Sequence, residues 1–144
     1  MFARGCEWVA DARGCDAARL GDLDVLRTLF DRVIATLELR PVADTVWHRF
    51  PPIAESGAVG GGITGMCMLA ESHLTVHTFP EHGTLCLNVF CCRVRDDWDV
   101  EAVLGSLLAG PGFAVRVSRI EREIAPSAVP GLRPADARRG VQSL

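Results

Sequence analysis

The stretch that decides the fold runs over residues 63–92 and reads ITGMCMLAESHLTVHTFPEHGTLCLNVFCC. It holds three short runs of strand-forming residues, separated at residues 71–72 and by the turn-forming sequence PEHG at 80–83. In the second and third runs, aliphatic side chains alternate with polar or aromatic ones, which is the period of a strand with one buried face. The stretch therefore predicts an antiparallel meander of three strands.

The alternation assigns the side chains of the meander to two faces. The aliphatic face carries Leu74, Val76 and Thr78 from the second strand, and Leu85, Leu87, Val89 and Cys91 from the third. The opposite face carries His73, Thr75, His77 and Phe79, and then Cys86, Asn88, Phe90 and Cys92. We expect the aliphatic face to pack on helices, and the other face to form a site or a second interface.

Two amphipathic helices flank the meander. Asp22 can cap the first, whose apolar residues recur at helical spacing over 25–37. The second is predicted over 97–108, and the sequence Gly-Pro-Gly at 110–112 should stop it.

Further strands are predicted over 7–12, 40–50 and 113–120, with a turn at 13–16 after the first. The order of elements indicates an α+β fold, a two-layer sandwich with a mainly antiparallel sheet and helices on one face. One domain should cover residues 1–124, because 144 residues suit a single core, and the proline-containing segment 125–144 is expected to be a poorly ordered tail.

The composition excludes several classes of function. All 15 basic residues are arginine and are scattered, and the net charge of −3 argues against nucleic acid as a partner. Without lysine the chain can form neither a pyridoxal-phosphate Schiff base nor a Walker-type phosphate loop. No signal peptide or apolar run of about 20 residues is visible, so we expect no membrane contact and a cytoplasmic protein whose six cysteines are thiols.

Three local features could carry chemistry. The glycines at 60–62 lack the ending of a phosphate loop and are better interpreted as a flexible connector. His73 and His77 lie about 13 Å apart along an extended strand, too far to share one metal ion, so no metal site is predicted. Ser72 lies near both histidines, but no nucleophile elbow surrounds it, so a strand with surface polar residues explains the pattern equally well.

The run at 71–81, ESHLTVHTFPE, closely resembles the processing-site signature of the bacterial S-adenosylmethionine decarboxylases, the small pyruvoyl-dependent class, whose usual form is ESHLTIHTWPE. The segment 5–16 is similar to the opening strand of that family, 48–50 to its His-Arg-Phe and 90–92 to its Phe-Thr-Cys. The resemblance covers residues 5–124.

This resemblance implies that the chain makes its own carbonyl cofactor. The Ser72 hydroxyl would attack the Glu71 carbonyl, the amide would become an ester, and elimination would release Glu71 as a carboxylate. The dehydroalanine left at position 72 would hydrolyse to a pyruvoyl group derived from Ser72. The products would be a β chain, 1–71, and an α chain, 72–144, whose αβ units pair into an αββα homodimer. The implied substrate is S-adenosylmethionine, decarboxylated for spermidine synthesis.

The resemblance also implies roles for single residues. His77 matches the histidine that helps to remove the α-proton during processing, and Thr64 stands where the family has a serine that supports the acyl shift. Cys92 matches the cysteine that returns a proton to the substrate carbon. Its neighbour Cys91 belongs to the aliphatic face and is expected in the core.

The expected substrate pocket departs from the family pattern. Phe50 and Phe79 stand where the family has aromatic residues that stack on adenine, and Glu81 follows the second of them, but Phe79 replaces a tryptophan. Glu7 replaces a histidine and Asn88 an acidic residue. These changes leave open a pyruvoyl-dependent decarboxylase of another amino acid, arginine or ornithine.

A non-catalytic homologue that acts as a binding subunit is the alternative from another class. The feature that discriminates is the presence together of Glu71, Ser72, His77 and Cys92, which a binding subunit has no reason to keep.

Overall fold

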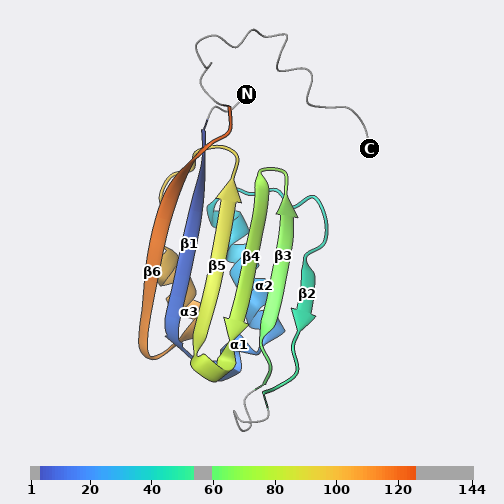
Figure 1. Cartoon of the computed structure of the whole chain (residues 1–144), viewed down its shortest axis with the longest axis vertical. Coiled ribbons are helices and arrows are strands. Elements are labelled where there is room, and N and C mark those ends of the chain that lie inside the picture. The colour runs from blue at the N-terminus through green and yellow to red at the C-terminus, as the bar shows by residue number, and fades with distance from the viewer. Residues whose placement is uncertain (1–3, 54–59, 126–144) are drawn as a thin grey trace.

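The computed structural model describes residues 4–53 and 60–125. Its centre is one six-stranded antiparallel sheet with the order β2-β3-β4-β5-β1-β6 (Figure 1). The strands are β1 (Arg4–Cys15), β2 (Val46–Arg49), β3 (Ile63–Leu69), β4 (Ser72–Phe79), β5 (Thr84–Cys91) and β6 (Ala109–Glu123). The tail expected beyond residue 125 lies outside the described residues.

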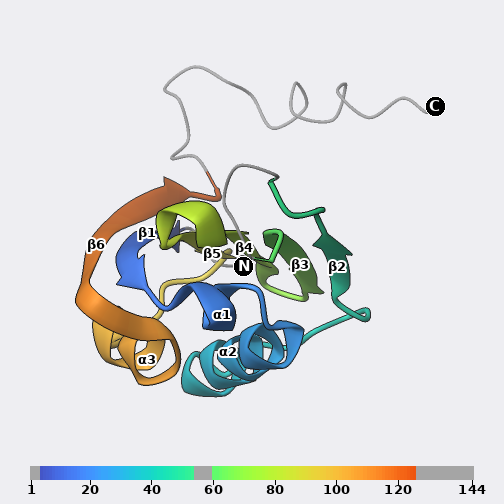
Figure 2. The ribbon, with the colours of Figure 1, turned by 90° about the horizontal axis from the view of Figure 1, so that it is seen from below.

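Helices cover only one face of this sheet. They are α1 (Ala17–Leu20), α2 (Leu23–Thr36) and α3 (Val100–Leu108), and a 3-10 turn, η2 (Pro80–His82), joins β4 to β5. Seen from below, the helices form one layer and the sheet the other (Figure 2). The predicted two-layer α+β architecture is confirmed. Within the described residues, no helix is long and apolar enough to cross a bilayer.

The meander is present as predicted, with β4 hydrogen-bonded between β3 and β5 at the middle of the sheet. Leu74, Val76 and Thr78 of β4 are buried under the helices, while His77 and Phe79 are exposed on the other side. The four alternate residues of β5 from Leu85 to Cys91 are buried as well. The sequence alternation thus predicted both faces correctly.

The first predicted helix has the cap expected for it. The Asp22 carboxylate accepts a hydrogen bond from the backbone N–H of Asp24 at 2.9 Å, and α2 buries the apolar side chains Leu26, Leu29, Phe30 and Val33 against the sheet. The second helix, α3, begins at Val100 and not at residue 97, because Asp99 is its cap.

Strands β1 and β6 are longer than predicted. The expected turn at 13–16 lies mostly inside β1, and the glycines expected to stop the helix at 110–112 lie inside β6, because the two strands pair along almost their whole length. A bulge between Arg13 and Cys15 absorbs the irregularity. Gly14 has a φ of 64° there, and a Cβ on it would lie 2.5 Å from the carbonyl oxygen of Gly112.

The strand predicted over 40–50 is wrong in its first half, since only β2 forms a ladder with β3. Pro41 makes a single bridge to Leu69. The backbone of the preceding residue, Arg40, bonds to the turn between β3 and β4. Its N–H donates to the Glu71 carboxylate at 3.1 Å, and its carbonyl accepts from the Ala70 N–H at 2.8 Å. This segment therefore closes the turn between β3 and β4.

The glycines at 60–62 are not merely a flexible connector. A Cβ on Gly61 would lie 1.7 Å from the carbonyl oxygen of Phe50, and one on Gly62 would lie 2.3 Å from that of Thr78. These residues permit close backbone contact beside β4.

Candidate active site

The Glu71–Ser72 peptide bond lies at a tight turn. Leu69 pairs with Ser72, so only Ala70 and Glu71 connect β3 to β4. The carbonyl oxygen of Glu71 accepts a hydrogen bond from the backbone N–H of Cys92 at 2.7 Å. A fixed N–H aimed at this oxygen would stabilise negative charge developing on it.

Ser72 has an unusual backbone conformation, with a φ of 149°. This angle costs an L-residue on the order of 1–3 kcal/mol, and such strain is often found at functional sites. Tetrahedral geometry fixes Cβ relative to the backbone, so this φ also sets the dihedral angle about the Ser72 N–Cα bond between the Glu71 carbonyl carbon and the Ser72 Cβ. That angle is about 30°, which is close to eclipsed. A small angle here is what closure of a five-membered ring by the serine hydroxyl requires.

The Glu71 side chain is only 2 % exposed and lies among arginines. Its Oε1 accepts from Arg40 Nε at 2.9 Å, and guanidinium nitrogens of Arg93 and Arg95 lie 3.6 and 4.0 Å away. Burial by itself would raise the pKa of this carboxyl, but the hydrogen bonds from Arg40 outweigh it and hold the pKa below its ordinary value. Sequence reasoning missed these arginines; the pattern Cys-Cys-Arg-Val-Arg at 91–95 was the only local signal.

The remaining predicted residues gather at the other end of β4. Thr64 and His77 are cross-strand partners, and the Thr64 hydroxyl lies 2.9 Å from Nδ1 of His77. Both line a hollow of about 400 Å³ together with Phe50, Phe79 and Glu81. The structure therefore brings five of the predicted site residues together.

The two groups are separate within one chain. His77 is five residues beyond Ser72 on an extended strand, which places the two about 17 Å apart. The end of β4 at Ser72 holds Glu71 and Cys92, and the other end holds Thr64 and His77. A histidine at this distance cannot take a proton from Ser72 of the same chain.

Cys91, the last residue of β5, and Cys92, which follows it, differ in burial as predicted. Cys91 is fully buried in the core, and burial raises the pKa of its thiol to about 12. Cys92 is half-buried, and its N–H is the donor to Glu71. In the described part of the chain, no group of three or more His, Cys, Asp or Glu side chains could hold a metal ion.

Two departures from the expected family pattern contact each other on the uncovered face. Asn88 donates to the Glu7 carboxylate at 2.7 Å, and its side-chain oxygen lies 3.0 Å from Nε2 of His73. Arg122 also pairs with Glu7. The hydrogen bond from Asn88 keeps the pKa of Glu7 below its ordinary value, against the opposing effect of burial and with help from Arg122. In this chain the acidic side chain of the pair is therefore at position 7 and the amide at position 88.

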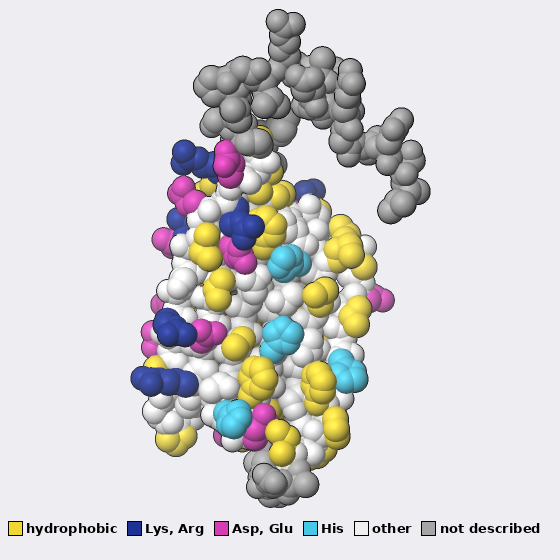
Figure 3. Space-filling view, in the orientation of Figure 1, with side chains coloured by type: hydrophobic (Ala, Val, Ile, Leu, Met, Phe, Trp, Pro, Cys, Tyr) yellow, Lys and Arg dark blue, Asp and Glu magenta, His cyan; other side chains and the backbone are white. Residues whose placement is uncertain are grey.

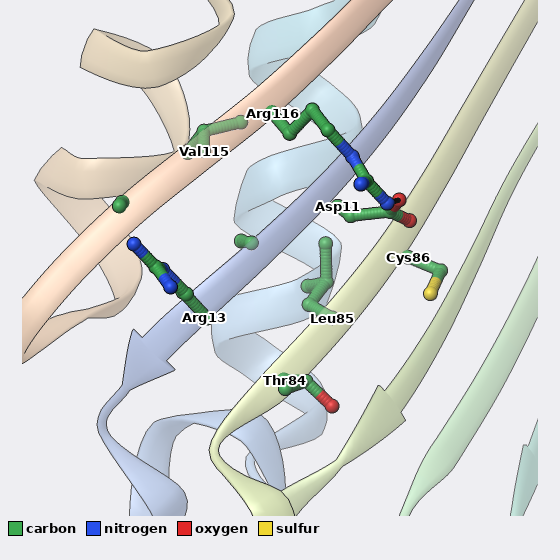
Figure 4. A pocket seen from close by; sticks show the side chains of 9 residues that line it. Asp11, Arg13, Thr84, Leu85, Cys86, Val115 and Arg116 are labelled. Carbon is green, nitrogen blue, oxygen red and sulfur yellow. Dashed lines mark hydrogen bonds and ion pairs between the residues drawn. The ribbon is translucent and has the colours of Figure 1, made fainter.

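Another hollow lies over β1, β5 and β6 on this face (Figure 4). It measures about 680 Å³ and contains none of the predicted site residues. Arg116 crosses it to the Asp11 carboxylate at 2.9 Å and lowers the pKa of that carboxyl, while burial and then Asp11 raise the pKa of the Cys86 thiol.

Comparison with known proteins identifies the chain. Residues 6–123 match the family model described as S-adenosylmethionine decarboxylase. An S-adenosylmethionine decarboxylase proenzyme 2 from Halalkalibacterium halodurans is 37% identical over 69% of this chain and 72% of the relative. A proenzyme from Geobacillus kaustophilus is 35% identical over 67% of this chain and 70% of the relative.

A solved structure supports the fold. The adenosylmethionine decarboxylase of Aquifex aeolicus superposes with a TM-score of 0.65, covering 90% of this chain and 98% of that one at 23% identity. The α+β sandwich is therefore the same in both. Given the match over nearly all described residues, this chain belongs to the S-adenosylmethionine decarboxylase family.

Proposed function

We propose that the chain is a self-processing, pyruvoyl-dependent decarboxylase of S-adenosylmethionine that serves spermidine synthesis. The observation that carries the proposal is the geometry at residues 71–72: a carbonyl held by a backbone N–H and a serine turned toward it. The relatives named as S-adenosylmethionine decarboxylase proenzymes favour this substrate over arginine or ornithine. A non-catalytic binding subunit would have no need for the strained Ser72.

Processing would begin with attack of Ser72 Oγ on the Glu71 carbonyl carbon. The developing oxyanion would accept from the Cys92 N–H, and breakage of the C–N bond would leave an ester and a free amine. Loss of the Ser72 α-proton would then break the Cβ–Oγ bond and release Glu71 as a carboxylate. The dehydroalanine left at residue 72 would take up water and release ammonia to become a pyruvoyl group. Residues 1–71 would then be the β chain, and 72–144 the α chain that begins with this group.

The residues present fit such a group. The turn leaves Ser72 half-buried at the end of a central strand, next to the segment that carries Cys92. A pyruvoyl group supplies an electron-poor carbonyl that accepts the electrons released as carbon dioxide leaves. Cys92 would hold the proton that is returned to the substrate carbon.

The active unit would be a homodimer, because one chain does not bring its own residues together. The uncovered face presents a row of histidines among apolar side chains (Figure 3). Val46, Met66, Met68 and Phe79 are all exposed on described strands, an unusual amount of apolar surface for a monomer. A two-fold axis between two such faces, perpendicular to β4 and near its middle, reverses the strand direction. The Ser72 end of each copy then faces the His77 end of the other in an αββα sandwich.

In this arrangement His77 of one copy would take the Ser72 α-proton of the other. The Thr64 hydroxyl holds Nδ1 of the histidine at 2.9 Å and so orients the ring, leaving Nε2 for proton transfer. The hollow beside this pair would receive the adenosyl part of the substrate. Phe50 and Phe79 offer rings for stacking on adenine, and the Glu81 carboxylate offers a hydrogen-bond acceptor.

All six cysteines are free thiols, which suits the cytoplasmic location that we propose. Neither nucleic acid nor membrane has a part in the proposed reaction.

Intact-mass measurement tests the proposal. The purified protein should be two chains cut between Glu71 and Ser72, while Ser72→Ala should stay a single chain of 15.6 kDa. The cut protein should release carbon dioxide from S-adenosylmethionine and not from arginine or ornithine. A parent chain that remains whole after prolonged incubation would show that the proposed processing is wrong.

A further inference from the structure

Arg95 is a nearly buried cation with few partners. Its side chain is 14% exposed, and its Nε is buried with no hydrogen-bond acceptor among the described residues. Another guanidinium nitrogen donates to the neutral carbonyl of Glu38 at 3.2 Å, and the nearest carboxylate oxygen, on Glu71, is 4.0 Å away. Buried charges in proteins are usually paired and hydrogen-bonded more closely than this. The charge of Arg95 is therefore only partly compensated in the uncut chain.

The Glu71 side chain does not satisfy this cation, because Arg40 already holds it. Arg40 donates to one carboxylate oxygen from Nε at 2.9 Å and to the other from its backbone at 3.1 Å. The main-chain carbonyl of Glu71 is bound to the N–H of Cys92, in the segment that leads directly to Arg95. Cleavage after residue 71 creates a second carboxylate from this carbonyl carbon.

We propose that Arg95 receives the new carboxylate of Glu71 and stabilises it as the leaving group in the second processing step. The inference rests on the proposed function. In that step a base removes the Ser72 α-proton, its electron pair forms the Cα–Cβ double bond, and the Cβ–Oγ bond breaks. The bonding electrons of Cβ–Oγ leave with Oγ, which becomes an oxygen of the Glu71 carboxylate. A fixed positive charge beside this group lowers the barrier to its departure.

Arg95 stabilises the uncut chain only weakly, because its guanidinium group has no close carboxylate partner there. The charge matters only once the ester begins to break, so its removal should slow elimination more than it slows the preceding acyl shift. Loss of one preorganised group of this kind costs about 100- to 1000-fold in rate. Arg95 lies 4.0 Å from its present carboxylate neighbour, so we expect the lower end of this range, about 100-fold.

The experiment follows processing during cell-free synthesis, with and without neutral hydroxylamine, which cuts an ester but not an amide. Parent, Arg95→Gln, Arg95→Lys and a matched control, Arg27→Gln on the exposed surface of α2, are compared by intact mass. Arg95→Gln should accumulate a whole chain that hydroxylamine splits at residue 71. Arg95→Lys keeps the charge and should restore much of the rate, and Arg27→Gln should process as the parent does.

The outcomes distinguish a failure of the proposed role of Arg95 from a failure of the proposed function. A parent that never cuts overturns both. A parent that cuts, with Arg95→Gln cutting equally fast and no hydroxylamine-sensitive chain, overturns the role of Arg95 alone. If Arg95→Gln fails to fold, Arg40→Gln provides the second test, because its exposed side chain is not needed by the core and its loss diverts Arg95 to the Glu71 side chain. Arg40→Gln should also accumulate ester, and its absence there would overturn the inference.

Discussion

Two inactive variants should restore processing when they share a dimer. Ser72→Ala lacks the nucleophile and His77→Ala lacks the proposed base, and each alone should stay uncut or stop at the ester. The five residue steps from Ser72 to His77 on β4 correspond to about 17 Å, so under the proposed mechanism the residues of one site come from two chains. A mixed dimer contains one site with both Ser72 and His77 and one site with neither.

The expected yield follows from this geometry. With equal co-expression and random pairing, about half of the His77→Ala chains pair with a Ser72→Ala chain, and only these can be cut. Cleavage of His77→Ala chains should therefore approach about one half, while Ser72→Ala chains remain whole. Chains of different tag length allow intact-mass measurement to count both species.

A second mixture provides the control. When the parent is co-expressed with a chain that carries both substitutions, every mixed dimer should lack a complete site. Only about half of the parent chains should then be cut, although each of them has both residues. If instead all parent chains were cut, and no His77→Ala chain were cut in the first mixture, each chain would process itself and the shared site would be refuted.

Other predictions concern stability. Thr78 donates to the Leu20 carbonyl at 2.8 Å and accepts from the Ile63 N–H at 2.9 Å. In urea titration of the uncut Ser72→Ala chain, adding Thr78→Val should therefore lower the free energy of unfolding by about 2–5 kcal/mol. Thr28→Val, which removes an exposed hydroxyl, should change it by less than about 0.5 kcal/mol, and equal losses would contradict the assignment. The pKa of Glu71 is lower in the folded state than in the unfolded state. The stabilisation that this carboxylate gives to the folded protein should therefore be complete above pH 4.5, the ordinary pKa of Glu, and should be lost as the pH falls below that value. Glu71→Gln should weaken this acid dependence of the unfolding midpoint, and an unchanged pH profile would show that the carboxylate is not held by arginine.

Local alternation was enough to predict the centre of the fold. The two faces of β4 and β5 follow from side chains two residues apart, and the cap at Asp22 follows from residues that adjoin it. The lengths of β1 and β6 could not be read in this way. Their ladder joins residues more than 90 positions apart in the sequence, and this pairing overrides the local turn signal at Gly14.

The candidate site was predictable in part. A contiguous motif identified Ser72 and His77, and the predicted strand implied that they lie far apart, although the spacing argument was applied only to His73 and His77. The contact of Arg95 with Glu71 depends on a loop beyond β5 returning to the turn before β4. The backbone angle of Ser72 likewise results from the closed turn and has no counterpart in residue type.

The strand order has a consequence for the protein after cleavage. The β chain would supply β1, β2 and β3, and the α chain would supply β4, β5 and β6. In the sheet order β2-β3-β4-β5-β1-β6, two strands of the β chain are followed by two of the α chain, then by one of each (Figure 1). Three ladders, β3–β4, β5–β1 and β1–β6, would each join one product to the other. Neither product can leave without opening the sheet. Once it has opened, refolding is no longer a first-order reaction but requires an encounter between two molecules, so recovery from denaturation should depend on protein concentration. The mature protein would thus keep its fold through a slow rate of unfolding, with a covalent chain needed only the first time it folds.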